Sequence, residues 1–319
     1  MMRTLPDLMT EPVVRMALAE DLGRAGDMTA QACIPEGARM KAAFAARKPG
    51  VLAGIDAVRL AVLAMDPRAS IDVRLNDGAA QVNAEPIFFS GAVEIAPKLA
   101  GRVERVLAAE GSLVEAGAVL AVVEADARGF LSAERTALNL LGRLSGVATL
   151  TRAYVEAVAG TRARIADTRK TTPGLRALEK HAVACGGGIN HRFGLDDAIL
   201  IKDNHVAVCG GVAEAVRRAK AFAPHLMKVE VEVDGLDQLD AVLALIGEGA
   251  APDVVMLDNF SLADLRTAVA RVAGRITLEA SGGVDLTTVR GIAETGVDVI
   301  SVGALTHSAP VLDIGLDAL

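Results

Sequence analysis

The chain has 319 residues, a formal net charge of −7 at pH 7 and a hydrophobic content of 52%, with only 3% aromatic residues and no Trp. This length suggests one large or two moderate domains, and a core of Ala, Val, Leu and Ile favours an α/β architecture. The acidity argues against nucleic-acid binding, and no apolar run reaches the length of a membrane span, so we expect no membrane partner.

Two further features indicate the compartment. The N-terminal residues 1–21 carry acidic side chains where a signal peptide needs an apolar segment. The cysteines Cys33, Cys185 and Cys209 form no CxxC pair, and we interpret them as reduced thiols. We therefore expect a cytoplasmic protein.

The first 140 residues predict a smaller α/β domain. A helical pattern at 13–23 is followed by a strand pattern at 41–54, a helical pattern at 56–66 and short β-like runs at 93–128. A segment around 75–105 is interpreted as extra, either an additional hairpin or a motif related to carrier-domain hairpins. A long periodic helix at 130–160 closes this half, and we expect the C-terminal tail, 308–319, to pack back on the domain.

Residues 141–307 alternate between short aliphatic runs and helical patterns. Such alternation is typical of βαβ units with a parallel sheet, and this number of units in series favours a (β/α) barrel, here an incomplete one. The predicted strands lie within 162–168, 198–205, 228–234, 253–260, 276–283 and 298–308.

Each aliphatic run ends in a polar residue or glycine. In (β/α) barrels the carboxyl ends of the strands form the active site, and the last loops often hold phosphate. The strand-end residues are therefore expected to surround one pocket: Asp167, Lys202, Glu232, Asp258, Ser281 and Gly303.

The candidate pocket combines cations with carboxylates. The cations are Arg135, Arg169, Lys170, His191, Arg192 and Lys202. Glu232 and Asp258 end two strands and suit a hydrated Mg²⁺, which bridges to phosphates. The glycines of "SGG" and "VGA" let backbone N–H groups approach phosphate oxygens. The set predicts a site for an anionic substrate and a phosphorylated co-substrate.

Other interpretations remain open from the residues alone. In a half-exposed strand, Glu230 and Glu232 with Asp234 would form a solvated face. Lys202 could also be a Schiff-base lysine of a phosphate-binding barrel lyase or aldolase. We expect the remaining histidines to be structural or exposed: His181, His205 and His225.

The stretch "DTRKTTPGLRALEKHAVACGGGINHRFGLDDAILIKDNH" resembles the signature of quinolinate phosphoribosyltransferases, also called carboxylating nicotinate-nucleotide pyrophosphorylases, of the type II phosphoribosyltransferase family. The resemblance continues through "AERTALNLLGRLSGVAT", "VMLDNF" and "ETGVDVISVGALTHSAPVLDIGLD", and it covers nearly the whole chain. It implies an N-terminal open α/β sandwich and an incomplete barrel. It also implies a reaction of de novo NAD biosynthesis, in which quinolinate and phosphoribosyl pyrophosphate give nicotinate mononucleotide, pyrophosphate and CO₂ with Mg²⁺.

The resemblance also implies residue roles. Quinolinate would be bound by Thr168, Arg169, His191, Arg192 and Lys202, together with Arg135 from the neighbouring subunit of a homodimer or higher oligomer. Phosphoribosyl pyrophosphate would be bound by Lys170, Ser281, Gly282, Gly303 and His307. The catalytic set would be Lys170, Lys202, Glu232 and Asp258, the two acids holding Mg²⁺ directly or through water.

The alternatives to this transferase come from three classes of protein. The first is a molybdenum-transport accessory homologue of the same family, which we expect to lack the "KDNH" that this chain carries at 202–205. The second is the barrel lyase or aldolase using Lys202. The third, a metabolite sensor on an inactive barrel, would require missing catalytic positions.

Overall fold

The computed structural model describes residues 5–73 and 110–319, so the segment predicted as extra lies outside the described residues. The chain divides into two compact units. Unit 1 comprises residues 1–150, 172–187 and 309–319, and unit 2 comprises residues 151–171 and 188–308. This division differs from the predicted boundary after residue 140, because residues 172–187, expected in the barrel domain, belong to unit 1.

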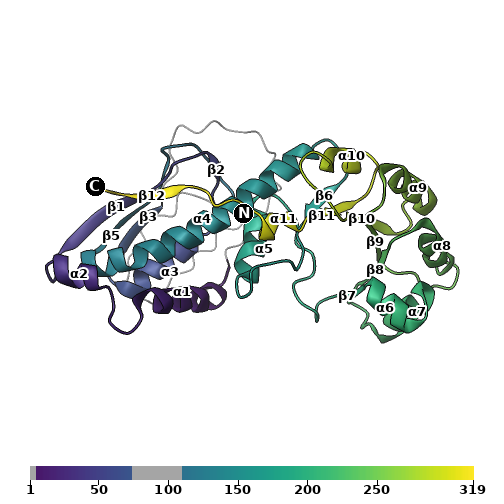
Figure 1. Cartoon of the computed structure of the whole chain (residues 1–319), viewed down its shortest axis with the longest axis horizontal. Coiled ribbons are helices and arrows are strands. Elements are labelled where there is room, and N and C mark those ends of the chain that lie inside the picture. The colour runs from purple at the N-terminus through teal and green to yellow at the C-terminus, as the bar shows by residue number, and fades with distance from the viewer. Residues whose placement is uncertain (1–4, 74–109) are drawn as a thin grey trace. The chain divides into compact units, whose positions relative to one another are not determined.

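Unit 1 is built on an antiparallel sheet with the strand order β12–β1–β5–β3 (Figure 1). The strands are β1 (Arg39–Ala46), β3 (Ser70–Val73), β5 (Val119–Asp126) and β12 (Ile314–Ala318). Ala42 to Ala46 of β1 are all buried, and the strand is paired along one edge with β5 and along the other with β12. The last residues of the chain thus complete a sheet whose first strand begins at Arg39.

Helices and a short strand pair complete unit 1. They are α1 (Asp7–Leu22), α2 (Met28–Cys33), α3 (Ile55–Met65), α5 (Arg176–Cys185), and β2 (Gly50–Val51) paired with β4 (Leu113–Val114). The long helix α4 (Ala127–Ala157) begins in unit 1 and continues into unit 2. Phe44 of β1 and Phe130 of α4 are the two largest fully buried side chains among the described residues, and their ring centroids lie 6.2 Å apart.

The C-terminal segment approaches α4 at two glycines. Leu312 N–H donates a hydrogen bond to Gly142 O at 3.0 Å. At Gly146 an added Cβ would lie 2.0 Å from Pro310 O, far inside contact distance. Only glycine permits this approach of the backbone, which leads the chain toward β12.

Unit 2 is an incomplete (β/α) barrel, as predicted. Its parallel strands follow the order β7–β8–β9–β10–β11–β6, so the last strand pairs with the first and the opening lies between β6 and β7. The strands are β6 (Arg164–Ala166), β7 (Ile199–Ile201), β8 (Val229–Val233), β9 (Val254–Asp258), β10 (Thr277–Ser281) and β11 (Val299–Ser301). The helices are α6 (Asp203–Cys209), α7 (Val212–Phe222), α8 (Leu236–Ala244), α9 (Leu262–Val272), α10 (Val289–Ala293) and α11 (Ala304–His307).

The strands of unit 2 curve with their helices on the outer side (Figure 1). In β8 the valines Val229, Val231 and Val233 are at most 1% exposed, whereas Glu230 and Glu232 alternate with them. Because side chains alternate between the faces of a strand, the two glutamates share the face opposite the valines. The face that the helices leave uncovered is therefore polar.

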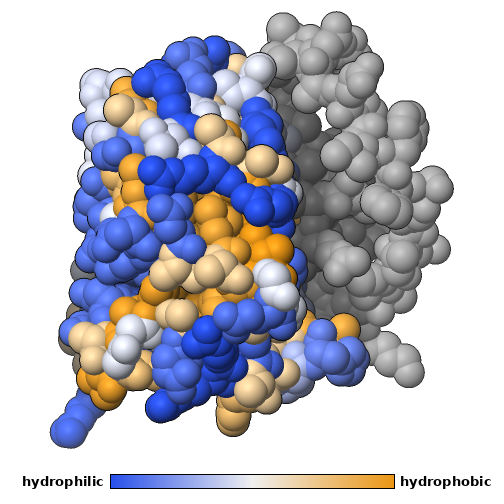
Figure 2. All heavy atoms as spheres, turned by 90° about the vertical axis from the view of Figure 1, so that its right-hand side faces the viewer, coloured by the Kyte–Doolittle hydropathy of each residue, from blue (hydrophilic) through white to orange (hydrophobic). Residues whose placement is uncertain are grey.

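The outer face of unit 2 is covered by amphipathic helices. Figure 2 shows hydrophilic side chains around its margins and hydrophobic atoms across its middle. Helix α7 buries Val212, Ala215 and Val216 and ends in the exposed Phe222. Within residues 5–73 and 110–319, no helix combines the length and apolar character that crossing a bilayer requires.

We predict that Gly146→Ala destabilises the protein, although alanine is the better helix former. The added methyl group must displace the Pro310 carbonyl, and such overpacking costs about 1–3 kcal/mol, which exceeds the helix-propensity gain of about 1 kcal/mol. The thermal midpoint of unfolding should fall. Gly247→Ala is the matched control, because its Cβ meets only Ala244 O at 3.7 Å. Equal midpoints for the two variants would contradict the close approach.

Candidate active site

A pocket with about 1240 Å³ of solvent-connected space opens in unit 2 at the carboxyl ends of the barrel strands. Its walls contain most of the predicted site residues: Thr168, Arg169, Lys170, His191, Arg192, Lys202, Glu232, Asp258, Ser281 and Gly282. They come from segments up to 114 positions apart, between Thr168 and Gly282. The barrel topology brings these segments together.

Four predicted residues do not line this pocket. Arg135 is exposed on α4 in unit 1. Gly303 and His307 lie next to the lining residue Lys170, because a Cβ added at Gly303 would be 3.0 Å from Lys170 Cδ and 3.2 Å from His307 Nε2. The strand-end residue Asp167 is fully buried and does not line the pocket.

The segment that follows β6 is held by short-range hydrogen bonds. Lys170 N–H donates to Thr168 Oγ1 at 3.0 Å, and Lys170 O accepts from Thr306 Oγ1 at 2.8 Å. With its backbone fixed at both ends, Lys170 extends an exposed side chain across Gly303. The glycine leaves room for that side chain.

Two arginines on the pocket wall lack acceptors for part of their guanidinium groups. Arg192 donates from Nη1 to Ala198 O at 3.2 Å, but among the described residues neither its buried Nε nor that of Arg169 has a hydrogen-bond partner. Burial and the positive charge of Arg169 both lower the pKa of Arg192. Two like charges with unused donors form a site that an anion with several oxygens would satisfy.

Beneath the arginines lies a cluster of buried acids around His191. His191 Nε2 lies 2.9 Å from Glu230 Oε2 and 3.7 Å from Glu279 Oε1. The fully buried Asp167 accepts the His191 backbone N–H at 2.8 Å and Asn190 Nδ2 at 2.6 Å. The Arg192 backbone N–H donates to His191 Nδ1 at 2.8 Å, so the imidazole is fixed on one side by backbone and on the other by two carboxylates.

Glu279 carries the largest resolved change among these acids. Burial, followed by the negative charge of Glu230, raises its pKa to about 7, although His191 acts in the opposite direction. The sequence did not predict Glu279 as a site residue, and it indicated Glu230 only as part of a solvated face. The signal was present in the alternation of "VEVEV" and "TLEAS", in which each strand places its acid on the inner face.

The opposite part of the pocket carries the two predicted metal-binding acids. Lys202 Nζ lies 3.3 Å from Glu232 Oε2, and Asp258 Oδ2 accepts Asn259 Nδ2 at 2.7 Å. Asn259 has a positive φ of 56°, a conformation uncommon outside glycine. It packs so closely on Gly282 that a Cβ there would lie 2.1 Å from Asn259 Oδ1. This contact explains the first glycine of "SGG".

His205, expected to be structural or exposed, is both. Its Nδ1 accepts the backbone N–H of Lys202 at 2.9 Å at the start of α6, and its side chain is exposed. This hydrogen bond fixes the backbone of a pocket lysine. The "KDNH" stretch therefore includes one residue that lines the pocket and one that supports it.

Comparison with known proteins places both halves of the chain in one family. The model described as "Quinolinate phosphoribosyl transferase, N-terminal domain" matches residues 79–145, and "Quinolinate phosphoribosyl transferase, C-terminal domain" matches residues 147–317. The carboxylating nicotinate-nucleotide pyrophosphorylase of Mycobacterium leprae is 45% identical over 307 residues, which cover 95% of each chain. A probable enzyme of the same name from Synechocystis sp. is 35% identical and covers 98% of this chain and 93% of its own length.

Solved structures agree with the sequence matches. The nicotinate-nucleotide pyrophosphorylase of Francisella tularensis superposes with a TM-score of 0.83 at 36% identity, covering 100% of this chain and 99% of that one. The enzyme designated NadC from Streptococcus pyogenes gives a TM-score of 0.82 at 35% identity, covering 99% of each chain. Both likenesses extend over the two units and the pocket.

We predict that Glu279→Gln changes the pH dependence of stability. A carboxyl with a raised pKa in the folded protein stabilises the fold below its ordinary pKa of 4.5, and that stability is lost as the pH rises through about 7. The variant cannot titrate here, so its stability relative to wild type should increase with pH in this window, by at most about 1.4 kcal/mol per unit.

Thermal unfolding of both proteins across this pH range measures the effect. Asp317→Asn is the control, because a hydrogen bond from Arg47 lowers the pKa of Asp317 below its ordinary value of 3.8, so the stability difference between this variant and wild type should stay constant across this pH range. A stability difference between Glu279→Gln and wild type that stayed constant with pH would be incompatible with the raised pKa.

Proposed function

The chain belongs to the quinolinate phosphoribosyltransferase family, and we propose that the pocket of unit 2 is where it transfers the phosphoribosyl group of phosphoribosyl pyrophosphate to quinolinate. The products are nicotinate mononucleotide, pyrophosphate and CO₂. The observation that carries this assignment is the arginine pair, because Arg169 and Arg192 present buried Nε groups without acceptors on one wall. A pyridine with two carboxylates supplies the missing oxygens.

Quinolinate binds at the arginine wall. Planar guanidinium groups match carboxylates through paired hydrogen bonds, so arginines discriminate for a dicarboxylate better than lysines would. Thr168, His191 and Lys202 line the same pocket and contribute further donors. His191, held against Glu230 and Glu279, presents a fixed ring rather than a freely rotating one.

Phosphoribosyl pyrophosphate occupies the opposite side. Asn259 bends next to Gly282 and Gly283, whose φ values of 93° and 59° are positive, so the backbone there can approach phosphate oxygens closely. Ser281 lines this part of the pocket, and Lys170 extends toward it past Gly303 and His307. We assign this region to the 5′-phosphate and the pyrophosphate.

The carboxylates of Glu232 and Asp258 serve the reacting sugar. As pyrophosphate leaves and the quinolinate nitrogen attacks, positive charge develops at the anomeric carbon, and the two carboxylates stabilise it. Lys170 and Lys202 stabilise the negative groups on either side. The N-ribosylated ring is a pyridinium, whose positive nitrogen stabilises the electron pair left on the adjacent ring carbon as CO₂ departs. That carbon then takes up a proton from solvent, which gives nicotinate mononucleotide.

The donor set of Glu232 and Asp258 fits Mg²⁺. The two acids end the adjacent strands β8 and β9, and no cluster of three ligating side chains among the described residues includes either of them. Mg²⁺ usually keeps several waters and binds through one or two carboxylates together with substrate phosphates. When bound, the ion supplies positive charge to the pyrophosphate group.

Arg135 belongs to this proposal through a second subunit. It is exposed on α4, and no described residue pairs with its guanidinium. We assign it to the quinolinate site of a neighbouring subunit in a homodimer. The compartment we propose is the cytoplasm, supported by three cysteines that are all free thiols.

The direct test is incubation of the purified full chain with quinolinate, phosphoribosyl pyrophosphate and Mg²⁺. Nicotinate mononucleotide should accumulate, and nicotinate in place of quinolinate should give little product, because it lacks the second carboxylate. Asp258→Asn is the inactive control. Equal turnover of the two pyridines would overturn the dicarboxylate assignment of the arginine wall.

Arg135→Ala should raise the KM for quinolinate and leave the fold intact, measured by steady-state kinetics and thermal unfolding. Co-expression with Glu232→Gln then tests the subunit exchange. In a mixed dimer one site combines an intact Glu232 with an intact partner Arg135, so random pairing should restore about a quarter of the wild-type activity. If Arg135 acts within its own chain, the mixture stays inactive.

A further inference from the structure

Three side chains of unit 1 bring different metal-ligating atoms together, and none of them lines the pocket of unit 2. His181 Nε2 lies 2.8 Å from Glu110 Oε2. Cys185 Sγ lies 3.3 Å from the same oxygen and 3.5 Å from His181 Nε2. A nitrogen, an oxygen and a sulfur thus form a compact triangle, one donor atom from each residue.

Two of the three residues are positioned by helix α5. His181 and Cys185 are four residues apart, so they lie on the same face of the helix, one turn from each other. Cys185 is the last residue of the helix and is 1% exposed. Because the two ligands are four residues apart on one helix, they already lie side by side, and no loop has to become ordered to bring them together.

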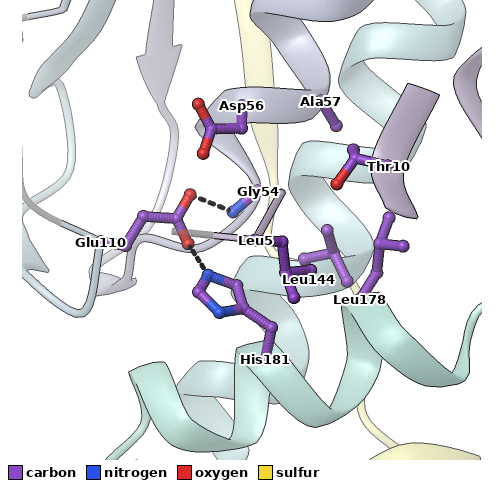
Figure 3. Close-up of a pocket in the computed structure, with 9 residues that line it drawn as sticks. All are labelled: Leu5, Thr10, Gly54, Asp56, Ala57, Glu110, Leu144, Leu178 and His181. Carbon is purple, nitrogen blue, oxygen red and sulfur yellow. Dashed lines mark hydrogen bonds and ion pairs between the residues drawn. The ribbon is translucent and has the colours of Figure 1, made fainter. Parts of the chain in front are cut away.

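The third residue is fixed from the other direction. Glu110 Oε1 accepts the backbone N–H groups of Gly54 and Ile55, both at 2.9 Å, at the start of α3. The Gly111 N–H donates to Leu52 O at 2.8 Å and holds the adjoining turn. One carboxylate oxygen of Glu110 therefore accepts hydrogen bonds from the backbone, and the other points toward His181, as Figure 3 shows.

The cluster is enclosed but not sealed. The side chains of His181 and Glu110 are 10% and 6% exposed. They form part of a small pocket with a cavity volume of about 10 Å³, whose other walls include Leu144, Leu178 and the polar Thr10. This volume holds about one water molecule beside the three donors.

We propose that Glu110, His181 and Cys185 form a binding site for a zinc-like divalent cation, with water from the adjoining pocket as the fourth ligand. Tetrahedral zinc with these ligand types requires donor separations of about 3.3–3.6 Å. Two sides of the triangle already lie at 3.3 and 3.5 Å, and only the Glu110–His181 side, at 2.8 Å, must lengthen.

The charge of the three ligands and the types of their donor atoms indicate which metal ion the site would bind. A carboxylate and a thiolate neutralise a dication, so the loaded site buries no net charge. Imidazole and thiolate favour zinc over Mg²⁺ and Ca²⁺, which take oxygen ligands. On binding, the Cys185 thiol releases its proton to solvent, and His181 keeps its ring proton on Nδ1 so that the Nε2 lone pair reaches the ion.

A reactive cysteine is the main alternative, and the surroundings oppose it. Burial and the neighbouring Glu110 charge raise the pKa of the Cys185 thiol, so without a cation it is not a nucleophile. A bound dication would instead connect α5 to the turn at Gly111 and, through Glu110, to the start of α3. The site is therefore structural, and its expected effect is on the stability of unit 1.

The test uses the purified full chain, stripped with a chelator and then given Zn²⁺ or Co²⁺. Elemental analysis should find about one zinc per chain, retained in excess Mg²⁺. The cobalt-loaded protein should show a thiolate-to-cobalt charge-transfer band, and zinc should raise the thermal midpoint. Absence of the charge-transfer band would overturn the proposal, because Cys185 would not be a ligand.

Variants separate this site from all others. Cys185→Ser should abolish the cobalt band and weaken zinc binding at least about a hundredfold. Glu110→Gln keeps an oxygen for the Gly54 and Ile55 N–H groups but loses the anionic ligand, so it weakens binding even if Cys185→Ser does not fold. Cys33→Ser and Cys209→Ser are matched controls that should retain the band. Zinc binding unchanged in both Cys185→Ser and Glu110→Gln would place the ion elsewhere and overturn the proposal.

Discussion

The balance of charge beneath the pocket is the constraint on which the rest of unit 2 depends. Glu230 and Glu279 are 7% and 4% exposed, and Asp167 is not exposed at all. Buried carboxylates are tolerated only when they are paired, hydrogen-bonded or protonated. His191 pairs with Glu230, and Asp167 accepts hydrogen bonds from the His191 backbone N–H and from the side-chain amide of Asn190. The raised pKa of Glu279 favours its protonated form. The buried carboxylates determine where the His191 ring lies, and the substrate pocket begins beyond this cluster of balanced charges.

In this arrangement the negative side chains are buried most deeply, and the positive side chains lie nearer the pocket opening. Acids occupy the floor, and the wall above carries arginines and lysines whose donors are only partly used by the protein. In the proposed reaction the wall neutralises two anionic substrates, while the acids near the sugar face the one centre that becomes positive. A chain with a net charge of −7 can in this way attract polyanions, because its local cations converge on one opening. The family of the chain agrees with the chemistry that this pattern predicts.

Much of this could be predicted from the sequence, and what was missed has physical causes. Period and flanking glycines located every barrel strand. The rule that strand ends converge named six residues, of which Lys202, Glu232, Asp258 and Ser281 line the pocket. The alternation of "VEVEV" could not say which face was inward, because a solvated face and a polar barrel interior give the same pattern. Helix α5 follows the first barrel strand in the chain yet belongs to unit 1, a tertiary choice that local periodicity does not encode. The left-handed conformation of Asn259 is equally invisible, since it depends on the contact with Gly282.

The strand β12 at the edge of the unit 1 sheet has a consequence for biosynthesis. Unit 1 is assembled from three separate stretches of chain, and its final strand consists of residues 314–318. During translation every barrel strand emerges from the ribosome before that edge is available. Strand β1 must therefore keep one side unpaired until residues 314–318 have emerged, and an unpaired strand edge invites pairing with other chains. Unit 1, although its first strands are made before the barrel, cannot be completed until after the barrel strands have been made.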